Sequence, residues 1–280
     1  MSVTAMASSS DSRPADAKGI EHLSYSSLTT YAHCPRKFYY RYIEHAAPEF
    51  VPAALAFGAA IHRAAEFIHH ASLEGRPIPE PERLLKSFDE AWAVSTAGGI
   101  PVSYASQDDA RSLRALAERM LSAYREHAFA ASLVRPIRVL AIEHVERFQL
   151  LKQVPPLEMR VDLVALASNG DLVIADLKTS RSRWNEIKLR EAIPQLVLYA
   201  SGLIPMFRAM KAKRFVARFI VITKAKVPLI QELNAHIDQS DVDKLKRLVN
   251  EVWSGIQQEV FIQRPGWACA QCPYKNRCLG

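Results

Sequence analysis

The chain has 280 residues and a formal net charge of +7, with 49% hydrophobic and 23% charged residues. This composition is typical of a globular protein that can bury a substantial core. The longest apolar stretch, residues 50–61, contains a proline and is too short to cross a membrane, so the sequence excludes a membrane protein of the helical type. The positive charge favours a polyanionic partner, and nucleic acid is the first candidate.

The N-terminal segment, residues 1–21, has no periodic apolar positions, and we predict a disordered tail there. It lacks the basic flank and apolar stretch of a secretory signal. We therefore expect a cytoplasmic protein whose four cysteines are reduced thiols rather than disulfides. Residues 22–280 are expected to form a single domain.

Helical patterns fill the first half of the chain. Apolar residues at helical spacing predict a helix that begins near Ser24, with Ser24 or Ser26 as its cap, and Pro35 should end it and open the next helix. We predict a helical insertion over about residues 57–130. Its first helix is predicted over residues 57–72, and two or three more follow, broken near the Gly98-Gly99 pair.

The pattern changes to short β-rich runs near Ile137. Strands are predicted within residues 139–150, 158–167, 171–179 and 214–225. A helix is predicted over residues 192–211, with Pro194 in its first turn, and an amphipathic helix over residues 241–257. This order of elements predicts an α/β fold, in which a mixed β-sheet core is flanked by helices and preceded by an N-terminal helical region.

Two carboxylates and one lysine stand out among the β-rich runs. Asp176 and Lys178 are two residues apart in a predicted strand, so they share a face. The preceding strand carries Asp162, and Ser168-Asn169-Gly170 lies between the strands. A two-residue turn would set Asp162 opposite Leu177, whereas a three-residue loop with its glycine in the left-handed conformation sets Asp162 opposite Asp176. We predict the three-residue loop, because it gathers the charged groups around one point.

Two adjacent carboxylates repel each other unless a cation lies between them, and Mg²⁺ or Mn²⁺ suits oxygen ligands. Such an ion would polarise a phosphodiester oxygen and lower the pKa of its bound water, while Lys178 would orient that water or neutralise charge on the phosphate. The alternative is that these groups are solvated strand ends. The apolar run LVIA beside Asp176 disfavours that alternative.

These motifs together resemble the PD-(D/E)XK nuclease superfamily, and its RecB-like branch most closely. The matching residues, in chain order, are Gly58 with His62, Met159-Arg160-Val161-Asp162, Asp176-Leu177-Lys178-Thr179, and Gln195 with Tyr199. Met159 stands where the branch usually has glycine. The resemblance implies a mixed β-sheet core of the restriction-endonuclease-like type and hydrolysis of DNA.

The resemblance also implies a role for individual residues. The metal ligands it implies are His62, Asp162, Asp176 and, through its carbonyl oxygen, Leu177. The catalytic or supporting residues it implies are Asp162, Asp176, Lys178, Gln195 and Tyr199. Without the resemblance, His62 and the Gln195–Tyr199 pair would read as packing residues. Glu143, on a predicted strand, could add a further carboxylate.

The four cysteines lie at the two ends of the chain. Cys34 is near the N-terminus, and Cys269, Cys272 and Cys278 form a C-x2-C-x5-C cluster. Four thiolates can hold zinc or an iron–sulfur cluster, and unligated thiols are the third reading. Zinc usually uses two C-x2-C pairs, and this chain has one. The arrangement resembles the iron–sulfur subset of RecB-like nucleases, which implies a [4Fe-4S] cluster that clamps the two ends together.

Basic residues gather in three segments, which suits binding to DNA. The segments contain Arg36, Lys37 and Arg41; Arg181, Arg183, Lys188 and Arg190, with Trp184 among them; and Lys211, Lys213 and Arg214.

We expect a metal-dependent deoxyribonuclease, an exonuclease on single-stranded DNA ends, in DNA repair, recombination or CRISPR adaptation. The sequence has no helicase motif, so a helicase or another repair or CRISPR protein would supply unwinding. The alternative is a non-catalytic DNA-binding or scaffolding subunit that retains the fold and the cluster.

Overall fold

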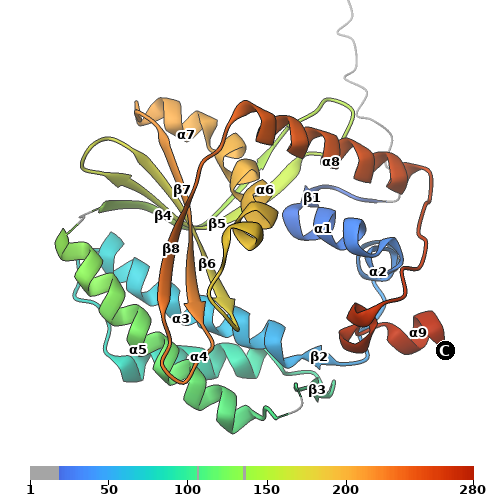
Figure 1. Cartoon of the computed structure of the whole chain (residues 1–280), viewed down its shortest axis with the longest axis horizontal. Helices are drawn as coiled ribbons and strands as arrows, with labels where there is room; N and C mark the ends of the chain where they lie inside the picture. The colour runs from blue at the N-terminus through green and yellow to red at the C-terminus, as the bar shows by residue number, and fades with distance from the viewer. Residues whose placement is uncertain (1–18, 106, 135–136) are drawn as a thin grey trace, which may run out of the picture.

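The computed structural model describes residues 19–105, 107–134 and 137–280, so residues 1–18 of the predicted tail lie outside it. A mixed β-sheet runs through the molecule, and helices cover both of its faces (Figure 1). This arrangement confirms the predicted α/β fold class. None of the helices in the described part of the chain is long and apolar enough to cross a membrane.

The strands and helices have the following bounds. The strands are β1 (Leu23–Ser24), β2 (Val51–Pro52), β3 (Val102–Ser103), β4 (Ile137–Phe148), β5 (Leu157–Ala167), β6 (Leu172–Ser180), β7 (Phe215–Thr223) and β8 (Ile230–Ala235). The α-helices are α1 (Tyr25–His33), α2 (Pro35–Phe38), α3 (Ala53–Leu73), α4 (Pro81–Ser95), α5 (Ala110–Val134), α6 (Glu186–Gly202), α7 (Ile204–Ala209), α8 (Gln239–Gln257) and α9 (Lys275–Leu279). A π-helical turn, η1 (Tyr39–Ile43), follows α2, and a 3₁₀ turn, η2 (Trp267–Gln271), precedes α9.

The main sheet contains six strands in the order β1-β5-β6-β7-β8, with β4 paired to the other edge of β5. The pairs β4–β5, β5–β6 and β7–β8 are antiparallel, whereas β6–β7 and β1–β5 are parallel. The short strands β2 and β3 form a separate two-stranded sheet. The parallel β6–β7 pair needs a crossover connection, and α6 and α7 supply it.

One edge of β5 changes its partner along the strand, and this change opens the sheet. Residues 163–166 of β5 pair with β6, whereas residues 157–158 pair with β1. The stretch between these two pairings contains Asp162. The sheet therefore divides at Asp162, where a side chain can enter the space between the strands.

Each face of the sheet has its own apolar core. Helices α1, α6 and α8 cover one face, where Leu28, Phe219 and Val249 are fully buried. Helices α3, α4 and α5 cover the other face, where Phe57 and Leu177 belong to the second core. Because side chains alternate along a strand, β6 sends Leu177 toward α3 and its neighbours toward α6.

The N-terminal helices begin as the sequence predicts. Ser24 caps α1, since its side chain accepts the Ser27 backbone N–H at 3.2 Å and the Ser27 hydroxyl oxygen accepts the Ser24 N–H at 2.8 Å. Pro35 is the first residue of α2, where its missing N–H costs no helical hydrogen bond. Both predictions are confirmed.

Three element predictions need correction. Helix α3 begins at Ala53, four residues before the predicted start. The helix predicted over residues 192–211 is two helices, α6 and α7, and Pro194 lies inside α6 rather than in its first turn. The reason is a local cap: the Asn185 side chain accepts the Lys188 N–H at 3.0 Å and starts the helix earlier. Strand β8 was not predicted.

Candidate active site

The hairpin between β5 and β6 has the predicted three-residue loop. Gly170 has a φ of +88°, and the Ala167 N–H donates to the Asp171 carbonyl at 2.9 Å, so residues 168–170 form the loop. The ladder pairs Leu163 with Ala175 and ends there, so Asp162 and Asp176 lie beyond it. The predicted three-residue loop is confirmed, and the predicted pairing of the two aspartates stays a prediction.

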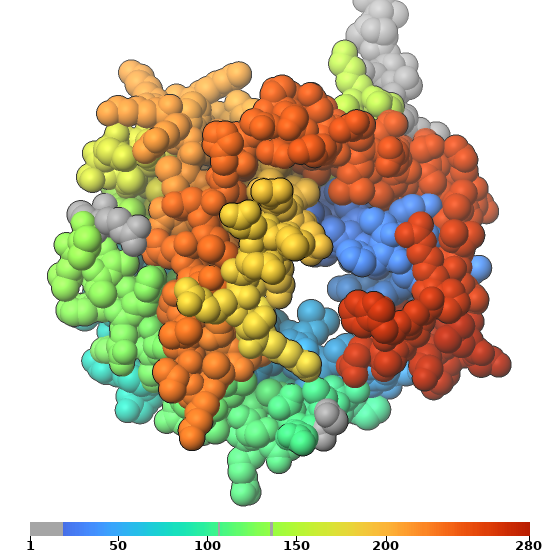
Figure 2. All heavy atoms as spheres, viewed as in Figure 1, coloured from blue at the N-terminus to red at the C-terminus, as the bar shows by residue number. Residues whose placement is uncertain are grey.

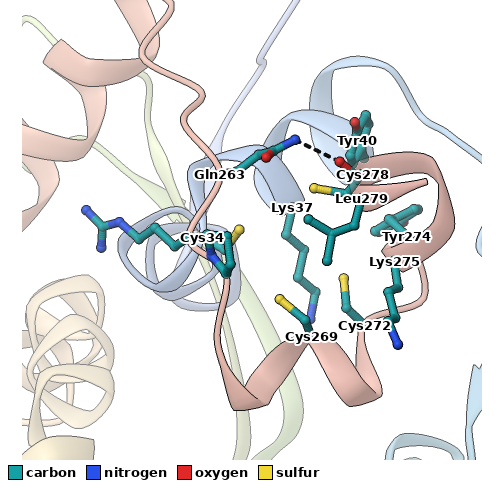
Figure 3. A pocket seen from close by; sticks show the side chains of 12 residues that line it. Cys34, Lys37, Tyr40, Gln263, Cys269, Cys272, Tyr274, Lys275, Cys278 and Leu279 are labelled. Carbon is teal, nitrogen blue, oxygen red and sulfur yellow. Dashed lines mark hydrogen bonds between the residues drawn. The ribbon is translucent and has the colours of Figure 1, made fainter.

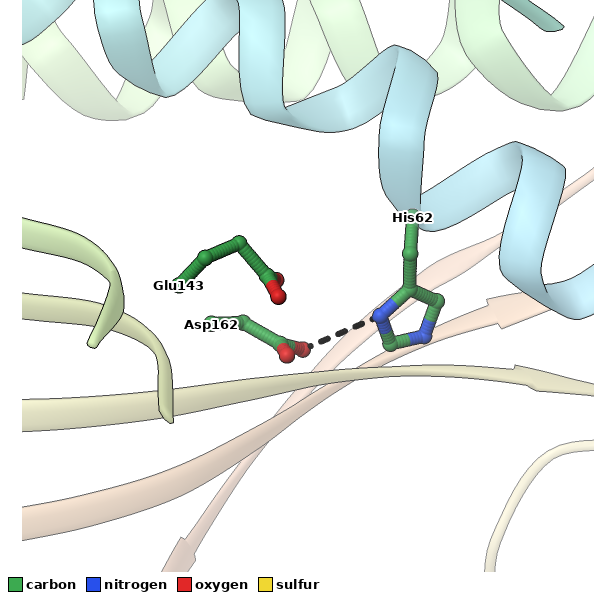
Figure 4. A group of neighbouring side chains, drawn as sticks. All are labelled: His62, Glu143 and Asp162. Atoms are coloured by element: carbon green, nitrogen blue, oxygen red, sulfur yellow. Dashed lines mark ion pairs between the residues drawn. The ribbon is translucent and has the colours of Figure 1, made fainter. Parts of the chain in front are cut away.

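Asp162 lies in the opening of the sheet and turns toward α3. Its Oδ2 is 3.3 Å from His62 Nδ1, and it accepts the Leu177 backbone N–H at 2.7 Å (Figure 4). That N–H belongs to β6, so the carboxylate takes the place of a strand partner. The sheet opening therefore fixes the position of the Asp162 carboxylate.

Glu143 completes this group of side chains. It lies on β4 between Ile142 and His144, which pair with the two neighbours of Asp162. One ligand atom each from His62, Glu143 and Asp162 lies within 4.8 Å of the others, and within the described ranges no other three His, Cys, Asp or Glu side chains meet this closely. Glu143 has a φ of +48°, a strained conformation of the kind that concentrates at functional sites.

The sequence offered Glu143 only as an optional extra carboxylate. Its place beside Asp162 depends on the pairing of β4 with β5, which is bulged between Val139 and Ala141. No turn motif in the sequence specifies that register. The alternating pattern of the strand puts Glu143 and Glu146 on opposite faces, but it does not show which face meets Asp162.

Asp176 and Lys178 form a second group, on the α6 side of β6. Lys178 Nζ lies 2.7 Å from Asp176 Oδ2. Asp176 Oδ1 accepts hydrogen bonds from the Gln195 amide at 2.9 Å and from the Tyr199 hydroxyl at 3.1 Å. Gln195 and Tyr199 therefore hold the buried carboxylate, while Lys178 remains 29% exposed.

The two groups adjoin through the backbone of Leu177, which lies between Asp176 and Lys178 in the sequence. The Leu177 N–H donates to Asp162. The predicted metal ligation by the Leu177 carbonyl oxygen stays a prediction. Asp176 is not part of the close group of His62, Glu143 and Asp162. The expected convergence of both aspartates on one ion stays a prediction, and the two side chains are near enough for the charge of Asp162 to act on Asp176.

The charges of the two groups influence each other. Burial alone would raise the pKa of Asp162, but the hydrogen bond and charge of His62 outweigh it and lower that pKa. Burial raises the pKa of Asp176, against the opposing charge of Lys178, and the negative charge of Asp162 adds to the increase. Burial and the Asp162 charge raise the pKa of Glu143 to about 7.

The first group has the donors that a hard divalent cation prefers. Two carboxylates and one imidazole suit Mg²⁺ or Mn²⁺, and repulsion between Glu143 and Asp162 would be relieved by a cation. Ligand atoms on one Mg²⁺ at about 2.1 Å lie at most about 4.2 Å apart. The observed limit of 4.8 Å is only slightly larger, so small side-chain movements would suffice.

The four cysteines line one small pocket between α2 and the C-terminal segment (Figure 3). All four are free and half-buried. In this part of the chain no three of their sulfur atoms lie within 4.8 Å of one another, whereas the thiolates around one tetrahedral zinc ion are about 3.8 Å apart. The cavity measures about 20 Å³, and Lys37 and Leu279 also line it. The donors suit a metal centre, but they are not arranged as a compact cluster.

The basic segments differ in their surroundings. Arg214 is engaged with Asp171 at 2.8 Å. Trp184 is half-buried, packs against Phe219 with a centroid distance of 5.1 Å and lies under the Lys188 ammonium group. Its expected role in base stacking stays a prediction.

The chain is similar to proteins of known structure and matches one family model. A crystal structure described as a "Putative exonuclease" from Eubacterium rectale shares the fold, with a TM-score of 0.55 at 12% identity over 93% of this chain and 90% of that one. The protein SSO0001 aligns with a TM-score of 0.35 at 12% identity, over 91% and 94% of the two chains. No curated protein matches this chain. The family model of the PD-(D/E)XK nuclease superfamily matches residues 22–279, and the chain belongs to that superfamily.

Proposed function

We propose that the protein is a divalent-metal-dependent deoxyribonuclease that acts as an exonuclease on single-stranded DNA ends. The observation that carries this proposal is the junction of the two groups, where Asp162 is hydrogen-bonded to the backbone between Asp176 and Lys178. A metal-ligand group and a buried acid–lysine pair thus occupy adjoining positions. A polyanionic substrate also agrees with the net charge of +7.

Each residue has a role that follows from its contacts. His62, Glu143 and Asp162 would hold Mg²⁺ or Mn²⁺, and Asp176 is the further ligand we propose. When bound, the ion would supply Lewis-acid polarisation of a phosphate oxygen and a more acidic water. Lys178 carries the cation nearest the buried acid and would neutralise charge that develops on the phosphate.

Gln195 and Tyr199 are positioning residues in this proposal. Burial and the charges of Asp176 and Asp162 raise the pKa of Tyr199 well above its ordinary value, so its hydroxyl keeps its proton and donates to Asp176. The Gln195 amide also contacts the Tyr199 hydroxyl, at 2.6 Å. The pair would hold the Asp176 carboxylate in one orientation.

We further propose a [4Fe-4S] cluster at Cys34, Cys269, Cys272 and Cys278. Four free thiols from the two ends of the chain, which line one pocket, support it. Its role would be to clamp the chain ends. A helicase or another DNA-processing protein would supply the single-stranded end.

The test is hydrolysis of end-labelled single-stranded DNA with Mn²⁺ by the wild type, Asp176→Asn and Lys178→Ala. We expect the rate of each variant to fall at least a hundredfold, because each substitution removes a charged group beside the reacting phosphate. Arg114→Ala, in an exposed ion pair with Asp89 on α4, is the matched control and should keep the full rate. Equal rates in the wild type and both variants would reject the assigned site. A wild type that cleaves no form of DNA would favour the scaffolding alternative.

A further inference from the structure

The hairpin between β7 and β8 projects beyond the end of β6, the strand that carries Asp176 and Lys178. Strands β6 and β7 are parallel, with Lys178 level with Val221 and Ser180 level with Thr223. Both strands end there, and residues 224–229 turn the chain back into β8 (Figure 1). We call these residues the hairpin tip. In Figure 2 the orange tip projects from the edge of the molecule.

Backbone hydrogen bonds hold the base of the hairpin tip in place. The Thr223 N–H donates to the Leu229 carbonyl oxygen at 3.0 Å, and the Thr223 hydroxyl oxygen accepts the Leu229 N–H at 2.8 Å. The Lys224 N–H donates to the Ser180 carbonyl oxygen at 2.6 Å, which joins the tip directly to the end of β6. The tip therefore has a defined position relative to Lys178.

The hairpin tip exposes apolar side chains. Val227 is 73% exposed and Leu229 is 48% exposed, with the half-buried Pro228 between them. Residues 224–228 contain no glycine, asparagine, aspartate or serine, which usually form exposed turns. A turn that gathers apolar side chains instead suits contact with an apolar surface.

Cations lie beside these apolar side chains. Lys226 is exposed, and no ion pair joins it to a carboxylate among the residues that the structure describes. At the base of the tip, burial lowers the pKa of Lys224, and the positive charge of Arg181 lowers it further, so these two cations are close to each other. The centre of a contact with another protein is usually depleted of charge, whereas lysine and arginine bind phosphates. The hairpin tip therefore suits nucleic acid better than a protein.

The end of a DNA duplex offers the surfaces that match the hairpin tip. The last base pair presents a flat apolar face, and the two strands carry phosphates on either side of it. Proteins that unstack bases insert apolar side chains such as leucine and proline between them. A tip of valine, proline and leucine beside cations therefore fits the end of a duplex.

The distance from the tip to Lys178 agrees with this match. The tip begins three residues beyond Val221, which is level with Lys178, and three residues of a strand span about 10 Å. Stacked nucleotides rise by about 3.4 Å each along a strand. A strand separated at the tip would therefore reach Lys178 after about three nucleotides.

We propose that the hairpin tip stacks on the last base pair of a DNA duplex and separates its two strands, so that one strand reaches the active site. That this strand is then cleaved rests on the proposed function. Separation of the last pairs requires no cleavage, because the tip would favour the open end by binding to it. It can therefore be measured in metal-free protein.

The test uses blunt DNA duplexes closed by a loop at the other end. They contain 2-aminopurine, whose fluorescence rises on unstacking, at the second or the tenth pair from the blunt end. Wild-type protein in EDTA is added to saturation, which the anisotropy of a dye on the loop reports. We expect the fluorescence at the second pair to rise at least threefold and that at the tenth pair to stay unchanged.

The hairpin tip is tested in the same assay with Val227→Ser/Leu229→Ser. This variant should bind the duplex within about threefold of the wild-type affinity, because the cations remain, but should lose most of the fluorescence increase. The matched control is Leu133→Ser/Val134→Ser, which removes the same two side-chain types from exposed positions on α5 and should give the wild-type signal. Val227→Phe should keep or increase the signal, because an aromatic ring stacks on bases.

Cleavage after Mn²⁺ is added separates this inference from the proposed function. The serine variant of the tip should cleave single-stranded DNA at the wild-type rate and blunt duplexes at least ten times more slowly. No fluorescence increase with the wild type, or an equal increase with the serine variant, would overturn the role of the tip. A fluorescence increase that depends on the tip, without cleavage of any DNA, would support that role and reject the nuclease.

Discussion

The ionised Glu143 carboxylate destabilises the metal-free site. Its pKa of about 7 in the folded protein lies above the ordinary 4.5, so the folded state binds its proton more tightly than the unfolded state does. Its contribution to stability is therefore present below about pH 4.5 and is lost as the pH rises to about 7, by about 3 kcal/mol. Burial and the neighbouring Asp162 cause this loss.

We predict that Glu143→Gln stabilises the metal-free protein at pH 8 and weakens its response to Mn²⁺. Removing the charge relieves the repulsion, but it also removes a ligand. Thermal melts in EDTA should show a higher Tm for the variant at pH 8 and little difference near pH 4.5, and Mn²⁺ should raise the Tm of the wild type more.

Glu146→Gln, three residues further along β4 and more exposed, is the control and should behave as the wild type. An unchanged Mn²⁺ response in Glu143→Gln would exclude Glu143 as a ligand.

At the scale of elements, strand β5 packs closely against helix α6 because Gly202 of α6 has no side chain. Met159, which stands where related motifs have glycine, is buried, and a Cβ added at Gly202 would lie 2.6 Å from its sulfur. We predict that Gly202→Ala destabilises the protein by about 2 kcal/mol through overpacking. The pair Met159→Ala/Gly202→Ala should cost less than the sum of its single changes, because the removed thioether leaves room. Urea unfolding of all four proteins measures this coupling, and strict additivity would contradict it.

Helices α3 and α5 are joined by a buried histidine. His69 Nε2 and the Tyr124 hydroxyl form a hydrogen bond of 2.8 Å, and burial lowers the pKa of His69 to about 4. As the pH falls, His69 is therefore protonated in the unfolded state before it is protonated in the folded state. The free energy of unfolding decreases by about 3 kcal/mol between about pH 6.5 and 4. His69→Gln should flatten this part of the pH–stability curve, whereas the exposed neighbour His70→Gln should not. Parallel curves for the wild type and His69→Gln would show that His69 does not carry the effect.

The elements that the sequence predicts well are those with local signals. The Ser24 cap, the Pro35 helix start and the Gly170 loop each depend on neighbouring residues, and each is confirmed. Strand β8 has no such signal, because its side chains are mostly half-buried and several are polar. Glu143 depends on a register set by tertiary pairing.

At the scale of the whole molecule, the four cysteines connect the two ends of the chain. They line one pocket although Cys34 and Cys278 are separated by nearly the whole sequence. A metal centre bridging them would remove loop entropy from the unfolded state, on the order of 5 kcal/mol for so long a loop.

We predict that protein purified without oxygen contains about four irons per chain and no zinc. Cys34→Ser and Cys278→Ser should each lose most of the iron and lower the Tm by several °C, because either change breaks the link between the ends. His33→Ala, beside Cys34 but with its ring hydrogen-bonded to Thr29, is the control and should keep its iron.

Iron and zinc analysis together with thermal melts distinguishes an iron–sulfur cluster, a zinc site and unligated thiols. One zinc per chain would contradict the cluster, and metal-free protein with an unchanged Tm in both serine variants would show that the thiols do not join the ends.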